Sequence, residues 1–176
     1  MSKKVRIQEK YVDYSPPVVV FRSIELLIRY VPDEYLHGLG DITLTNSRAL
    51  QSFRGKFWSE KRRLKPAECA GLYSDDRIIL VVDHVLGAYP EISLLIPQFK
   101  TFILGEVLYH EIGHHIHRNE KPGYRDNREV VADEWRDKLM GAFLAKRYWY
   151  LGAFARRFKW VLNPLMARMA RLDKED

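Results

Sequence analysis

The sequence predicts an α+β fold, because segments with the two-residue period of strands lie between segments with the period of helices. One helix comes first, short strands follow, and longer helices complete the chain. Hydrophobic residues make up 47% of the 176 residues and aromatic residues 12%, which suffices for one compact core. No internal repeat or low-complexity tract is present, which excludes solenoids and arrays.

The first helix is expected over residues 18–31, ending before Pro32. Its apolar side chains share one face at helical spacing: Ile24, Leu27, Ile28 and Val31. A strand is expected at residues 41–45, which alternate with period two and are rich in β-branched side chains.

Two further strands are expected on either side of a turn at Asp75-Asp76. The second is the nearly continuous apolar run from Ile78 to Val82, which is typical of a buried strand. The polar and basic stretch 54–65 precedes them and is assigned to a loop or insertion.

Two long helices are expected next, over residues 97–117 and 128–150. Pro122-Gly123 between them is the strongest turn signal in the chain and reverses its direction. A last helical segment follows, interrupted at Pro164 because proline cannot donate the helical hydrogen bond.

The first long helix contains the sequence Leu-Tyr-His-Glu-Ile-Gly-His-His-Ile-His at residues 108–117. His110 and His114 stand four residues apart, so both imidazoles leave the same face one turn apart. Two nitrogens so placed can occupy two corners of a zinc tetrahedron, and Glu111 can reach a metal-bound water. Gly113 allows another backbone to approach closely. The alternative is a polar helix face with this spacing by chance.

A catalytic zinc ion takes three protein ligands and keeps one position open. The second long helix offers Glu129 and Asp133, four residues apart on one face. We assign Glu129 to the metal and expect Asp133 to accept the other ring N–H of His110. Ala132 is small, which suits close packing of the two helices.

Other assignments of these acids stay open. Glu129 can be an ordinary first-turn acid favoured by the helix dipole, with Glu134 or Glu106 as the ligand instead, and Asp133 can be a solvent-exposed helix residue. His115 and His117 point from other helix faces and are treated as non-ligands.

His-Glu-x-x-His followed by Glu-x-x-x-Asp resembles the pattern of the gluzincin metallopeptidases. The short spacing is similar to that of their single-domain members, the minigluzincins, and of ImmA/IrrE-type peptidases. Segments 31–45 and 71–80 also resemble that fold, so the resemblance covers about residues 20–140. It implies a small zincin-like sheet with an active-site helix, and an edge strand that aligns the substrate peptide.

The activity implied is hydrolysis of peptide bonds by a zinc-dependent metallopeptidase, with Glu111 as the general base. A separate donor for the tetrahedral oxyanion is expected, and three residues are candidates: His84, Tyr124 and Tyr148. Two other functions remain. One is a catalytically silent metal-binding regulatory or interaction module, against which the intact Glu111 argues. The other is a nucleic-acid-associated protein that uses its basic loop and tail, although no recognised nucleic-acid-binding motif is present.

The tail has a pattern of its own. Apolar residues recur at alternating spacings of four and three, as in a heptad seam: Leu144, Tyr148, Leu151, Ala155, Phe158, Leu162, Leu165, Met169 and Leu172. The seam either packs on the protein's own core or forms a homodimer through the C-terminal helix. Basic and aromatic residues between these positions make anionic membrane surfaces and nucleic acids further candidate partners. We divide the chain into a metallopeptidase domain, residues 1–145, and a basic helical extension, residues 146–176.

Charge and cysteine content suggest the surroundings of the protein. The net charge is +6 and the sequence pI about 9.4, which permits anionic partners, although a solvated basic surface is the simpler interpretation. The single cysteine, Cys69, excludes an internal disulfide. No secretory signal is seen, and no window approaches the roughly 18 apolar residues of a spanning helix. We therefore expect a cytoplasmic protein acting on protein or peptide substrates.

Overall fold

The computed structural model describes residues 5–50, 69–120 and 127–149 of the chain. The expected loop at 54–65, the Pro122-Gly123 turn and the tail pattern beyond residue 149 lie outside these residues. The chain divides into two compact units, Met1–Met140 and Gly141–Asp176. The fold described below is that of the first unit, and the functional division at residue 145 stays a prediction.

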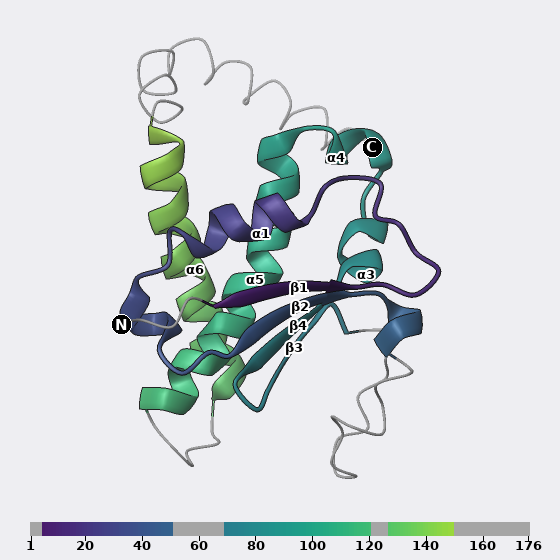
Figure 1. The fold of residues 1–176 in the computed structure, drawn as a ribbon. Helices are drawn as coiled ribbons and strands as arrows, with labels where there is room; N and C mark the ends of the chain where they lie inside the picture. The colour runs from purple at the N-terminus through teal and green to yellow at the C-terminus, as the bar shows by residue number, and fades with distance from the viewer. Residues whose placement is uncertain (1–4, 51–68, 121–126, 150–176) are drawn as a thin grey trace, which may run out of the picture. The chain divides into compact units, whose positions relative to one another are not determined.

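A mixed four-stranded sheet forms one part of the first unit, with the strand order β1-β2-β4-β3. Its strands are β1 (Arg6–Lys10), β2 (Asp41–Thr45), β3 (Gly71–Ser74) and β4 (Arg77–Val81). β2 pairs in parallel with β1 and with β4, whereas β3 pairs antiparallel with β4. The two edges of the sheet are therefore β1 and β3 (Figure 1).

The β3–β4 hairpin follows from its sequence. Ile78, Leu80 and Val81 of β4 are fully buried, as expected for the apolar run of a central strand. Asp75 and Asp76 have φ angles of 49° and 59°, the left-handed conformation that a two-residue hairpin turn requires. Aspartate tolerates this conformation better than most residues. Both strands and the turn predicted here are confirmed.

The longest helix is α5 (Pro97–Glu120), with 24 residues. It contacts β3 and β4 of the sheet and also packs against α1 (Figure 1). Its fully buried apolar residues and those of α1 and the sheet form the core: Leu104, Leu108, Ile112, Ile24, Leu27, Ile42, Leu44, Ile78 and Leu80. The helix predicted over residues 97–117 is thus confirmed and continues for three more residues.

Shorter helices surround α5. α1 (Phe21–Ile28) is shorter than the predicted 18–31, although Ile24 and Leu27 do face the core. A 3₁₀ turn, η1 (Asp33–Leu36), contacts α5, as do α3 (Val82–Gly87) and α4 (Glu91–Leu94).

The second long helix, α6 (Arg128–Arg147), occupies most of the predicted range 128–150. Together with α5 and the mixed sheet it confirms the α+β class. Across the described residues, no helix has the length and apolar character needed to cross a membrane.

One strand, β1, was not predicted from the sequence. Its residues, Arg-Ile-Gln-Glu-Lys, contain one apolar side chain, Ile7, which aligns with Ile42 of β2. An edge strand is held mainly by backbone hydrogen bonds to its neighbour, so its own side chains carry little signal. α3 and α4 were also not predicted.

Candidate metal centre

The site is formed where α5 and α6 approach each other at Gly113. A Cβ atom placed on Gly113 would lie 2.7 Å from the carbonyl oxygen of Ala132 and 2.8 Å from its Cα. A real Cβ atom does not approach that closely, so the approach requires glycine. Ala132 is itself fully buried. The small residues at 113 and 132 therefore bring the first turn of α6 against the His110–His114 turn of α5.

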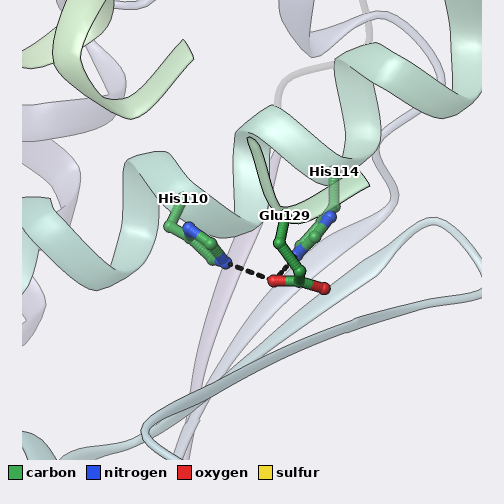
Figure 2. A group of neighbouring side chains, drawn as sticks. All are labelled: His110, His114 and Glu129. Atoms are coloured by element: carbon green, nitrogen blue, oxygen red, sulfur yellow. Dashed lines mark ion pairs between the residues drawn. The ribbon is translucent and has the colours of Figure 1, made fainter. Parts of the chain in front are cut away.

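His110, His114 and Glu129 come together at this contact. One ligand atom from each lies within 4.8 Å of the others. Oε2 of Glu129 is 3.4 Å from Nε2 of His110 and 3.5 Å from Nε2 of His114. Figure 2 shows this single carboxylate oxygen facing both imidazole rings. Within the described residues, these three form the one cluster of metal-binding side chains.

These distances suit a shared cation better than direct hydrogen bonds. Hydrogen bonds between such groups measure about 2.7–3.2 Å, shorter than both distances. A tetrahedral zinc ion with ligands at about 2.0–2.1 Å holds its ligand atoms roughly 3.3–3.4 Å apart. The donor set, two imidazole nitrogens and one carboxylate oxygen, is one that zinc accepts in catalytic sites. The residues present therefore fit a zinc ion.

Asp133 lies behind His110. Its Oδ1 is 3.0 Å from Nδ1 of His110. An ionised carboxylate only accepts hydrogen bonds, so Nδ1 carries the proton and donates it. The neutral ring then has its lone pair on Nε2, the nitrogen that faces Glu129. This is the tautomer that a metal ligand needs.

Glu111 is buried between α5 and β3, with 6% of its surface exposed. A Cβ on Gly71 would lie only 2.6 Å from its Oε1, so glycine at residue 71 lets the Glu111 side chain keep this position against β3 without shifting. The backbone N–H of Tyr73 donates a hydrogen bond to the carboxylate. Glu111 thus lies at the edge strand, next in sequence to His110.

The electrostatics at Glu111 favour a proton near neutral pH. Burial, and to a smaller extent the negative charge of Glu129, raise the pKa of the Glu111 carboxyl to about 8, although the Tyr73 hydrogen bond opposes both. A cation between the histidines and Glu129 would lower this pKa again by favouring the charged form. A carboxyl whose pKa lies between its ordinary value of 4.5 and about 8 can both take and return a proton near neutral pH.

His115 and His117 do not belong to the cluster of His110, His114 and Glu129. His115 is fully buried, and its Nε2 lies 3.0 Å from the carbonyl oxygen of His37. Its Nδ1 lies 3.0 Å from the hydroxyl of Tyr73. His115 therefore ties the end of η1 and the strand β3 to α5.

The alternative acids do not join the cluster. Glu134 is exposed on α6, and Glu106 instead lies 3.5 Å from Nε of Arg136. Of the oxyanion candidates, His84 donates from Nδ1 to the carbonyl oxygen of Cys69, at 2.9 Å. Tyr124 lies outside the described residues, and Tyr148 belongs to the second compact unit.

Two contacts of the site were not predicted from the sequence. One is the approach of Gly71 to Glu111, for which a glycine at the start of a predicted strand was the available signal. The other is Arg136, whose Nη1 donates to Oδ1 of Asp133 at 2.9 Å. Its position three residues after Asp133, on the same helix, could have suggested this pairing.

Comparison of the chain with protein-family models, with curated proteins and with solved structures returns no match.

Proposed function

We propose that this protein is a zinc-dependent metallopeptidase that hydrolyses peptide bonds. The observation that carries the proposal is the position of one Glu129 oxygen, 3.4 and 3.5 Å from Nε2 of His110 and His114. The partners expected around such a centre support it. Asp133 accepts the far ring N–H of His110, and Glu111 is buried beside the two histidines.

The fold we propose is zincin-like, of the minigluzincin kind. A helix carrying His-Glu-x-x-His lies beside an antiparallel edge strand, and a second helix brings the acidic residues. The sheet is small and mixed, with β3 at the edge next to α5. This order and placement of elements supports the proposed fold.

Each residue has a role in the proposed reaction. Zinc, when bound, supplies a Lewis acid that activates water for attack on a carbonyl. Glu111, whose carboxyl the bound cation returns towards the charged form, accepts the proton of the attacking water and carries it to the leaving amine. Asp133 keeps His110 in the ligand tautomer. The outer edge of β3 binds the substrate as an extended strand through backbone hydrogen bonds.

Metal analysis tests the first half of this proposal. The purified protein is expected to hold about one zinc ion per chain, and the double variant His110→Ala, His114→Ala none. His37→Ala is a matched control, because that side chain is exposed and only its backbone contacts His115. Full zinc content in the double variant would rule out the assigned ligands.

Hydrolysis tests the second half. A protein or peptide mixture incubated with the zinc-loaded protein is expected to yield new amino termini, and a chelator is expected to abolish them. A zinc-loaded protein that releases none would favour the catalytically silent module. A homodimer formed through the C-terminal helix and binding of nucleic acid or anionic membrane stay predictions, because the basic loop and most of the tail lie outside the described residues.

A further inference from the structure

Arg136 of α6 lies among carboxylates from both helices that form the candidate metal centre. Its Nη1 is 2.9 Å from Oδ1 of Asp133, and its Nε is 3.5 Å from Oε2 of Glu106 on α5. Nε and Nη2 also donate to Oδ1 of Asp137, at 3.0 and 2.9 Å. The guanidinium fork thus joins three acids, one of them from the neighbouring helix.

The oxygen that Arg136 contacts on Asp133 is the one that accepts from His110. Oδ1 of Asp133 lies 3.0 Å from Nδ1 of His110 and 2.9 Å from Nη1 of Arg136. The side chain of Asp133 is 49% exposed, so packing alone leaves it free to rotate away. Arg136 is 28% exposed and has a planar fork, which makes it the more rigid of the two.

The contact with Glu106 anchors this arrangement to α5. Glu106 stands four residues before His110, one turn earlier on the same helix. Arg136 therefore links the turn that precedes His110 to the aspartate that orients the His110 ring. None of these contacts requires a metal ion, so the orientation exists before a cation binds.

We propose that Arg136 is a positioning residue of the metal centre: it holds the carboxylate of Asp133 on His110 and thereby aims Nε2 of His110 at the cluster. The proposal rests on the zinc site proposed above, but not on the peptidase activity.

When Arg136 is replaced, the loss of its charge and the loss of its geometry have opposite effects on zinc affinity. Loss of the guanidinium leaves the negative charges of Glu106, Asp133 and Asp137 without their cation, which by itself strengthens the attraction for zinc. Loss of the guanidinium fork leaves the Asp133 side chain free to rotate, and this weakens His110 as a zinc ligand. Salt at about 1 M reduces the screening length to about 3 Å, so the charge effect largely disappears and the positional effect remains.

The test is zinc affinity at about 1 M salt, measured by competition with a chromophoric chelator. Arg136→Ala is expected to lower the affinity about tenfold, at the lower end of the range for lost outer partners of metal ligands. In the Asp133→Ala background the same change is expected to have no further effect, because Arg136 acts through Asp133. Arg136→Lys is expected to behave like Arg136→Ala, since an ammonium group cannot reproduce the fork.

A control and a second readout separate this role from general stability. Arg29→Ala removes an exposed arginine paired with Glu25 on α1 and is expected to leave the zinc affinity unchanged. With cobalt in place of zinc, Arg136→Ala is expected to shift the visible spectrum, which reports ligand geometry, and Arg29→Ala is not. Should Arg136→Ala fail to fold, Arg136→Gln gives the same comparison with a longer side chain.

The contradicting outcomes are distinct. Unchanged zinc affinity in Arg136→Ala would overturn the positioning role. So would an equal loss of zinc affinity when Arg136→Ala is made in the wild-type and in the Asp133→Ala background. A wild-type protein that binds no zinc would overturn both this inference and the proposed function. A wild-type protein that binds zinc but cleaves no peptide would overturn only the peptidase, and the affinity comparison would still decide the role of Arg136.

Discussion

The two helices that form the candidate metal centre hold their side chains in different ways. On α5, the side chains of His110 and His114 are 24% and 18% exposed, and the helix contacts both the sheet and α1. On α6, the side chains of Glu129 and Asp133 are 77% and 49% exposed. The histidines are therefore fixed by the core, whereas the acids are fixed by polar contacts at the surface.

This difference predicts which substitutions affect which property. A buried side chain on α5 contributes to the fold as well as to the chemistry, because its replacement leaves a cavity or an unpaired polar group. An exposed acid on α6 contributes little to folding, since water replaces its contacts at low cost. Variants on α6 should therefore change metal binding with little change in the free energy of unfolding.

The largest effect is expected at Glu111, on the buried side. Glu111→Gln should keep its zinc, because the residue is not assigned as a ligand, and lose hydrolysis by several orders of magnitude because the amide cannot accept the proton. The measurements are zinc content and the initial rate on a peptide substrate. Glu134→Gln, an exposed glutamate of α6, is the matched control. Wild-type rates in Glu111→Gln would exclude Glu111 as the base.

A smaller effect, confined to metal binding, is expected at Glu129. Glu129→Ala should weaken zinc binding by more than the roughly 10–100-fold that loss of an outer partner costs. Its unfolding free energy in the presence of a chelator should match that of the wild type, because the side chain is 77% exposed. Chelator competition and urea unfolding provide the two values.

Glu134→Ala tests the alternative in which Glu134, and not Glu129, is the metal ligand from α6. Glu134 is exposed and lies five residues after Glu129. Its truncation should therefore change neither the zinc affinity nor the free energy of unfolding. A loss of zinc affinity in Glu134→Ala, together with wild-type affinity in Glu129→Ala, would transfer the ligand role to Glu134.

The same contrast explains how much could be predicted from the sequence. Helical spacing places His110 and His114 on one face and Glu129 and Asp133 on another, and this information is local. Gly113 suggested a close backbone approach, and the backbone of Ala132 lies there. The periodicity of α5 and the apolar run of β4 likewise lie within one segment each.

Contacts between distant segments could not be predicted in this way. β1 pairs with β2 across more than 30 residues, and its own side chains show almost no strand pattern. The burial of Glu111 depends on Gly71 of β3, and the orientation of Asp133 depends on Arg136, which also reaches Glu106 on α5. Tertiary packing decides these contacts, and the sequence gives at most a residue type at the right position.

The smallest effect concerns the pH dependence of stability in the zinc-free protein, again at Glu111. The folded state raises the pKa of this carboxyl from 4.5 to about 8, chiefly by burial. The folded protein therefore favours the protonated form. The resulting stabilisation is fully present below about pH 4.5, declines as the pH rises, and is lost above about pH 8. Glutamine cannot ionise and should not show this loss.

Urea unfolding with a chelator present, at pH 5 and at pH 8.5, measures this difference. Glu111→Gln should gain stability relative to the wild type between the two pH values, on the order of 2 kcal/mol once relaxation and water entry reduce the full effect of the shift. Glu134→Gln removes an exposed carboxyl and should show no such gain. The same difference between Glu111→Gln and wild type at both pH values would mean that Glu111 reaches water in the zinc-free protein. The contrast between a buried α5 and an exposed α6 would then not hold at the residue on which the proposed chemistry depends.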